Sequence, residues 1–229
     1  MSLWSRIIER ISAFAGGSFA DLIFSTKRAP ERSDGFAMAV VALGAKMAKA
    51  DGRVTRDEVI AFREVFEIAD EDLPHVGRFY DLARQDVAGF DLYAARIARL
   101  FDDRTEALET LLEGLFHIAQ ADKLLHENEL EFLREVARIF GVHPSQFEAM
   151  HLRNRPGEAS PFDILGIEPG ASAAEARKAW HGLAARFHPD RLQGAGVPVE
   201  ARRMSEIRLA EINAAYDEVR RMQDAATTS

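Results

Sequence analysis

Apolar residues recur along most of the chain at spacings of three and four, which is the period of an amphipathic helix. Alanine, leucine, glutamate and arginine dominate these stretches, and none of them alternates between apolar and polar residues as a half-buried strand would. The pattern therefore predicts an all-α fold. Two polar segments interrupt it, at residues 25–35 and 153–161, and the second is rich in the Pro, Gly and Ser residues that favour domain boundaries.

These interruptions divide the chain into three predicted parts: an N-terminal amphipathic helix at residues 1–24, a helical domain at residues 34–152 and a smaller domain at residues 160–225. Within the first part, the apolar side chains of residues 3–15 share one helical face. Charged residues and Gly16-Gly17 break the run, whereas a membrane-crossing helix needs about 20 predominantly apolar residues. We therefore expect this helix to lie on a membrane surface, or to pack on the protein's own core or on a second subunit in a homodimer.

The middle part contains an internal repeat. The segment AKADGRVTRDEVIAFREV begins at Ala48, and AQADKLLHENELEFLREV begins at Ala119, with a constant offset of 71 residues. Each copy predicts a turn that opens on Ala-Asp and is followed by an amphipathic helix. Thr55 and Glu58 have the spacing of a capping box at the start of the first of these helices.

The repeated turns are acidic, which raises the question of a divalent-metal site. The candidate ligands are Asp51, Glu58, Asp122 and Glu129. An EF-hand loop needs oxygen ligands at alternating positions and a bidentate Glu at its twelfth place, and neither turn has that density. Helix capping explains the same carboxylates, so we expect no metal here, although a metal sensor built on these turns is one of the alternatives.

In the C-terminal part, two amphipathic stretches predict a helical hairpin. Ser172 and Glu175 fit a capping box at the start of the first helix, which ends at His188-Pro189-Asp190. A loop over residues 191–201 follows, and then the second helix. The apolar stripes of the two helices, closed at one end by the preceding element, predict a core formed by Leu165, Trp180, Leu183, Phe187, Ile212 and Tyr216.

The composition and the motifs that are missing exclude several classes of function. The net charge of −8 disfavours non-specific binding to nucleic acid, and the absence of Cys excludes disulfides, thiolate zinc sites and thiol catalysis. The sequence contains no phosphate-binding loop, no nucleophile elbow and no carboxylate pair beside a His with useful spacing. We therefore expect neither an enzyme nor a bound cofactor.

Specific motifs in the C-terminal part resemble the J-domain of DnaJ-type co-chaperones. These are Phe162-x-x-Leu165-Gly166, Arg177-Lys178-Ala179-Trp180, His188-Pro189-Asp190 and Glu211-Ile212-Asn213-x-Ala215-Tyr216. The Ala-x-Ala-Asp repeat resembles the TerB-like domain of tellurite-resistance proteins. The order of the parts resembles the DjlA subgroup, which carries an N-terminal membrane element, a TerB-like middle and a C-terminal J-domain.

The resemblance implies a co-chaperone that docks on a DnaK-type ATPase and stimulates its ATP hydrolysis, while the TerB-like domain recruits a client, a partner or a membrane site. It implies a cytoplasmic protein, either free in the cytoplasm or peripheral on the cytoplasmic face of the inner membrane. The residues that would contact the ATPase are His188, Pro189, Asp190, Arg177, Lys178, His181, Arg186 and Arg191.

The chain departs from the family at two positions on this basic face, since His181 and Gly182 stand where the family usually has Lys or Arg. A glycine inside a helix also costs about 1 kcal/mol relative to alanine. The alternative function is therefore a stress-response interaction or scaffold protein with a weakened J-domain.

Overall fold

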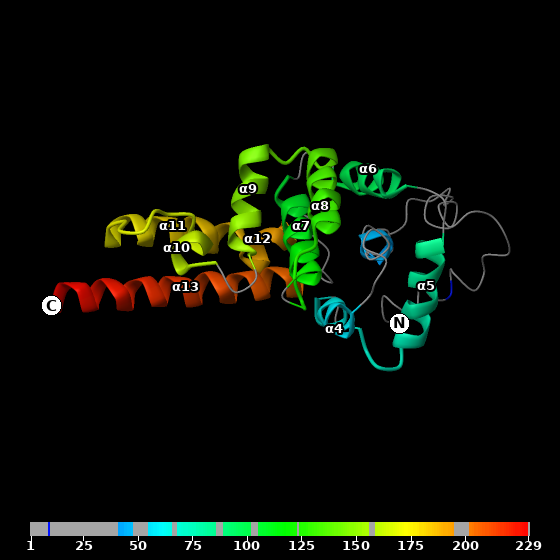
Figure 1. Ribbon diagram of the computed structural model, residues 1–229, viewed down its shortest axis with the longest axis horizontal. Helices are drawn as coiled ribbons and strands as arrows, with labels where there is room; N and C mark the ends of the chain where they lie inside the picture. The colour runs from blue at the N-terminus through cyan, green and yellow to red at the C-terminus, as the bar shows by residue number, and fades with distance from the viewer. Residues whose placement is uncertain are drawn as a thin grey trace.

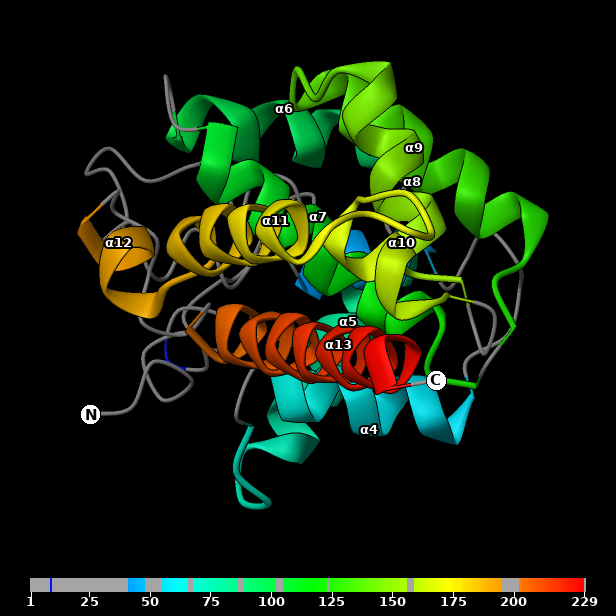
Figure 2. The ribbon, with the colours of Figure 1, turned by 90° about the vertical axis from the view of Figure 1, so that its left-hand side faces the viewer.

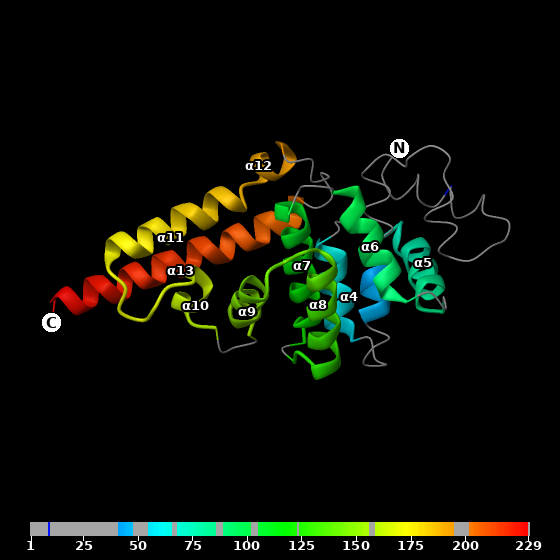
Figure 3. The ribbon, with the colours of Figure 1, turned by 90° about the horizontal axis from the view of Figure 1, so that it is seen from above.

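The computed structural model describes residues 9, 41–47, 55–65, 68–85, 89–101, 105–122, 124–155, 159–194 and 202–228. Throughout these ranges the chain is helical or forms the segments between helices, and none of the described residues lies in a strand. The predicted all-α fold is therefore confirmed. The helices form two bodies connected by one long helix, α13, as Figures 1 and 3 show.

The larger body is built from the helical residues 41–47 followed by α4 (Arg56–Val65), α5 (Leu73–Gln85), α6 (Phe90–Leu100), α7 (Thr105–Ala119), α8 (Glu127–Ile139) and α9 (Pro144–Arg153). Helix α7 is its central element, since it packs against α4, α8 and α13. Its side chains Leu112, Leu115 and Phe116 are fully buried. An apolar sequence on almost every side of α7 thus explains why other helices surround it.

Short-range hydrogen bonds fix where several of these helices begin and end. The Glu58 carboxylate accepts from the Thr55 backbone N–H, and the Thr55 hydroxyl accepts from the Glu58 N–H, which confirms the predicted capping box. In the second repeat, Glu129 closes the same reciprocal arrangement on His126. The two copies of the repeat therefore start their amphipathic helices, α4 and α8, in the same way.

The smaller body is a helical hairpin. It comprises α10 (Pro161–Leu165), α11 (Ala173–Arg186), α12 (Pro189–Gly194) and α13 (Arg202–Thr228). The predicted Ser172–Glu175 capping box starts α11. Helices α11 and α13 lie side by side (Figures 2 and 3) and run antiparallel, because the Gln223 amide near the end of α13 donates to the Ala171 carbonyl just before α11.

The segment after the His-Pro-Asp motif differs from its prediction as a loop, because residues 189–194 form the short helix α12. Proline at the first position of a helix has a suitable backbone angle and lacks only an N–H that would be unpaired there. Asp190 in the first turn also complements the helix dipole. The residues that end α11 therefore start a new helix at once.

Other predictions fall on residues that the structure does not describe. They concern the N-terminal helix at residues 1–24, of which only Glu9 is described, and the turn that contains Asp51. Among the helices that are described, none has both the length and the apolar character needed to span a membrane.

Candidate partner-binding site

The His188-Pro189-Asp190 turn connects α11 to α12 at the end of the hairpin that lies nearer the larger body (Figure 3). The Asp190 backbone N–H donates to Nδ1 of His188 over 3.3 Å. This hydrogen bond requires an unprotonated Nδ1, so Nε2 carries the proton of the neutral imidazole. The side chains of His188 and Asp190 are 53% and 83% exposed. The turn therefore offers one N–H donor and one carboxylate to an approaching partner.

A buried aromatic residue holds this turn in place. Phe187 follows α11 directly, and its N–H donates to the Leu183 carbonyl over 2.9 Å, as the last bond of that helix. Its side chain is fully buried in the hairpin core. Because the residue next to His188 is fixed by packing, the orientation of the exposed imidazole is set by the fold.

The predicted hairpin core forms, but its residues are buried to different extents. Leu165, Phe187 and Ile212 are buried, whereas Trp180, Leu183 and Tyr216 are only partly buried and pack at its edge. The Trp180 ring stacks on Tyr216, with 4.7 Å between centroids and 10° between planes. Its indole N–H also donates to the Asn213 side chain over 2.8 Å. Because the hairpin consists of only two layers of helix, one side of its core stays open. The side chain of Trp180 is therefore not enclosed.

The basic residues of α11 fall into two groups. Arg177, Lys178 and His181 are exposed, and no hydrogen bond or ion pair holds Arg177 or Lys178 to another described residue. Arg191 is exposed on α12. In contrast, Arg186 forms an ion pair with Glu109 of α7. The structure thus places seven of the eight predicted contact residues on exposed parts of α11 and α12 or in the turn between them, and turns the eighth toward the larger body.

Three of the four candidate metal ligands lie in the described part of the chain, and their carboxylates serve local structure. Glu58 and Glu129 cap helices, and an Asp122 carboxylate oxygen accepts from the Leu124 N–H over 3.0 Å. Within the described part of the chain, no group of three or more His, Asp or Glu side chains is arranged to hold a metal ion.

Comparison with known proteins gives the family of the larger body. The family model described as tellurite resistance protein TerB matches residues 37–152, which is half of the chain. The chain belongs to the TerB family. We call these matched residues the TerB domain, and we call residues 159–228 the hairpin.

Curated relatives extend the similarity beyond the TerB domain. A co-chaperone protein DjlA from Photobacterium profundum is 26% identical to this chain over an alignment 241 residues long. The alignment covers 93% of this chain and 86% of the relative. The DjlA proteins of Haemophilus influenzae and Coxiella burnetii are 25% and 23% identical, over 88% and 77% of this chain and 83% and 73% of their own lengths. The predicted resemblance to the DjlA subgroup is confirmed. No solved structure matches the chain.

The contact between the TerB domain and the hairpin includes buried charges that the sequence pattern did not predict. We call Glu109, Glu113, Arg153, Arg186 and Arg208 the interdomain charge cluster. Glu109 is only 3% exposed and pairs with Arg186, while its other oxygen accepts from the Gln146 amide over 3.1 Å. Arg186 comes from α11, so this pair fastens the end of the hairpin next to the His-Pro-Asp turn to the TerB domain.

The second carboxylate of the cluster lies one turn further along α7. Glu113 accepts from Arg153 over 2.7 Å and from the Asn154 amide over 2.8 Å, both residues at the end of α9. Burial alone would raise the pKa of Glu113, but the charges of Arg208 and Arg153, with the two hydrogen bonds, lower the pKa below its ordinary value. Glu113 is therefore held ionised between the TerB domain and α13.

A glycine lets α13 approach α7 closely at this point. A Cβ atom on Gly114 would lie 2.6 Å from the sulfur of Met204, and Met204 is buried in the same apolar core as the TerB helices. The signal in the sequence was a pair of carboxylates one turn apart, followed by a glycine, within a largely apolar stretch of the helix. That signal indicates a buried charged contact, although it does not identify the partner.

Proposed function

We propose that this chain is a co-chaperone that stimulates ATP hydrolysis by a DnaK-type chaperone, with the TerB domain recruiting a client or partner. The observation that supports this most directly is the exposed His188-Pro189-Asp190 turn, anchored by the buried Phe187. The docking surface consists of this turn together with Arg177, Lys178, His181 and Arg191. The similarity to proteins named co-chaperone DjlA over most of the chain supports the same function.

The chemistry of the docking surface suits recognition of an acidic protein. Exposed cations on α11 accelerate encounter with a negative patch, because complementary potentials raise association rates. The turn then contributes one donor, the Nε2–H of His188, and one acceptor, the Asp190 carboxylate. Because hydrogen bonds are directional, these two groups determine the orientation of the bound partner. In this mechanism the chain itself makes or breaks no covalent bond.

The interdomain charge cluster adds a second element to the proposal. Arg186, one of the residues expected to bind the ATPase, fixes the hairpin to the TerB domain through Glu109 instead. A client held by the TerB domain would then stay at a fixed distance from the His-Pro-Asp turn. Holding two partners on one frame raises their effective concentration toward each other.

The direct test is the His188→Gln variant of the full chain, assayed for stimulation of ATP hydrolysis by a DnaK-type chaperone. We expect stimulation to be lost while the melting temperature stays within about 1 °C, because surface substitutions that leave packing intact change stability little. His75→Gln on α5 is the matched control and should stimulate like the wild type. A large drop in melting temperature for His188→Gln would show that the turn is structural.

The alternative is a scaffold protein whose hairpin has lost its action on an ATPase, and Gly182 is the observation that favours it. Gly182 lies on the exposed side of α11, where a family member has a basic residue, and the space around its Cβ position is empty. The same assay separates the two functions, because a scaffold would give no stimulation with the wild type.

A further inference from the structure

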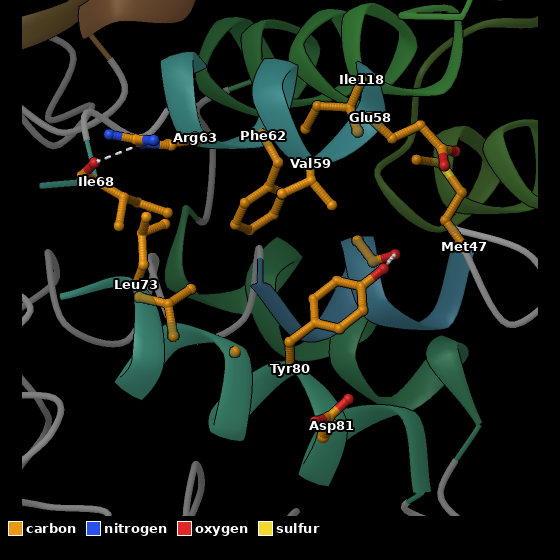
Figure 4. A pocket seen from close by; sticks show the side chains of 13 residues that line it. Met47, Glu58, Val59, Phe62, Arg63, Ile68, Leu73, Tyr80, Asp81 and Ile118 are labelled. Carbon is orange, nitrogen blue, oxygen red and sulfur yellow. Dashed lines mark hydrogen bonds between the residues drawn. The ribbon is translucent and has the colours of Figure 1, made fainter. Parts of the chain in front are cut away.

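The TerB domain contains an apolar cavity of about 300 Å³ between α4 and α5 (Figures 1 and 4). Val59 and Phe62 of α4 face Leu73 and Tyr80 of α5 across it (Figure 4). The Phe62 and Tyr80 rings meet edge to face, with 6.2 Å between centroids. Well-formed pockets of this size with a few polar groups at their edges are typical binding sites.

The cavity exists partly because residue 77 has no side chain. Gly77 lines it from α5, and a Cβ atom placed on Gly77 would meet no atom within 4 Å. An engineered apolar cavity of about 150 Å³ is large enough to bind benzene. The cavity between α4 and α5 has about twice that volume, so it can accept two aliphatic side chains from one turn of a helix.

The apolar surface continues from the cavity to the outside of the TerB domain. Val59 lines the cavity and is 50% exposed, and Ile60, next to it on α4, is 61% exposed. A small molecule enclosed in the cavity would leave this outer surface uncovered. A polypeptide segment would cover it while inserting side chains, as amphipathic helices do in apolar grooves.

The charges around the cavity set the chemistry of that segment. Two carboxylates, Glu58 and Asp81, line the cavity, and the cation beside them, Arg63, is already paired with Asp70. Beyond Asp70, whose charge Arg63 neutralises, the connection that leads into α5 adds Glu71 and Asp72. This potential repels anionic lipids and favours lysine or arginine at the flanks of the bound segment.

We propose that this cavity is the recruiting site of the TerB domain and binds a polypeptide segment that presents aliphatic side chains flanked by basic residues. The inference rests on the proposed co-chaperone function, for which it supplies the place where a client binds. Val59, Phe62 and Tyr80 contact the aliphatic side chains, and Asp81 meets the basic flank.

The experiment measures fluorescence anisotropy of a labelled amphipathic peptide of leucine and lysine titrated with the full chain. We expect saturable binding, and binding at least about tenfold weaker to Gly77→Leu, in which a side chain fills the cavity. Leucine is a better helix former than glycine, so this variant should melt no lower than the wild type. Val59→Ser should weaken binding as well, whereas Leu152→Ser, at a residue 45% exposed on α9, is the matched control and should not.

Several outcomes would overturn the proposal. They are no saturable binding to the wild type, equal binding to Gly77→Leu, and equal binding of a peptide with glutamate in place of lysine. Two other occupants would also replace it: dodecanoate binding that Gly77→Leu abolishes, in the absence of peptide binding, or a dimer that Gly77→Leu converts to monomers. Stimulation of the ATPase by the wild type, measured without peptide, tests the co-chaperone function separately, so failure of one is distinguishable from failure of the other.

Discussion

Helix α13 packs on the TerB domain at its beginning and on α11 further along, and the first contact adds charged groups to apolar packing. Near its start, Arg208 lies beside Glu113, and Arg203 pairs with Glu64 over 3.2 Å. Further along, Ile212, Ala215 and Val219 pack into the hairpin core, which is apolar. Buried charges are stable only while both partners are present and ionised, whereas apolar packing has no such requirement.

This difference bears on function. The hairpin has an apolar core of its own, distinct from the core of the TerB domain. Its attachment to the TerB domain, by contrast, combines ionised groups with the packing of Met204 and Ile207 on the TerB core and of α10 on α9. The contact between the domains is therefore sensitive to any substitution that removes one of the buried charges.

The largest effect is expected from Glu113→Gln, which removes the buried charge but keeps the size of the side chain. Arg153 would remain buried without its counter-charge and Arg208 would keep only Glu211, and breaking a buried pair in this way costs about 3–5 kcal/mol. Urea unfolding at neutral pH, followed by circular dichroism, measures the loss. Glu135→Gln, which breaks the exposed pair with Arg138, is the control and should change the midpoint little. Equal effects of the two variants would contradict a special role for the interdomain charge cluster.

The second prediction tests the apolar end of α13. Trp180→Ala removes the stack on Tyr216 and the hydrogen bond to Asn213, so the hairpin should be destabilised. Because Trp180 is only partly buried, we expect a loss of about 2–3 kcal/mol, below the 3–5 kcal/mol typical of enclosed aromatic residues. Thermal unfolding measures it. An unchanged melting curve would mean that α11 and α13 do not rely on this contact.

The sequence predicted the features that depend on neighbouring residues. The capping pairs Thr55–Glu58 and Ser172–Glu175 follow from a spacing of three, and Phe187 and Ile212 follow from helical periodicity. The pair between Glu109 and Arg186 joins helices that are distant in the sequence, and no local pattern specifies which carboxylate meets which cation. The close approach of Met204 to Gly114 depends in the same way on how two helices cross.

At the candidate site, too, the features that depend on neighbouring residues were predictable, whereas the contacts between distant residues were not. The exposure of His188 and Asp190 was predictable because the motif follows the last residue of an apolar stripe and lies outside it. The separation of Arg186 from Arg177 and Lys178 was not, since all three are basic residues on one helix. Helix α12 was missed because Pro189 was interpreted as the end of α11, although proline is equally suited to the first position of the next helix.

A third prediction uses pH to separate the two contacts of α13. The pKa of Glu113 in the folded protein lies below its ordinary value of 4.5, so its ionised form stabilises the fold above that value. This contribution is lost as the pH falls below 4.5 and passes through the folded pKa. The stability difference between wild type and Glu113→Gln should therefore shrink on acidification. The difference between wild type and Trp180→Ala should stay constant, and a parallel decline of both would argue against the titration of Glu113 as the cause.

The smallest effects are expected on the outward side of α11, which neither contact of α13 uses. The double variant His181→Lys, Gly182→Arg restores the basic residues of the family and adds up to two positive charges to the docking surface. The space around Gly182 is open, so the arginine fits, and replacing a helix-interior glycine should stabilise the chain by about 1 kcal/mol or less. Association with a DnaK-type chaperone should become faster at low salt, and the gain should fall as salt rises, because ions screen exposed charges.

The control for this prediction is Glu218→Lys, which makes a similar change in net charge at an exposed position of α13. Stopped-flow association at two salt concentrations compares the two variants. If the docking surface is the one proposed, only the α11 variant should gain markedly in rate, since steering depends on charge close to the contact. Equal acceleration by Glu218→Lys would show that net charge alone is responsible. An unchanged rate for the α11 variant would mean that the chaperone docks elsewhere and that His181 and Gly182 carry no consequence for it.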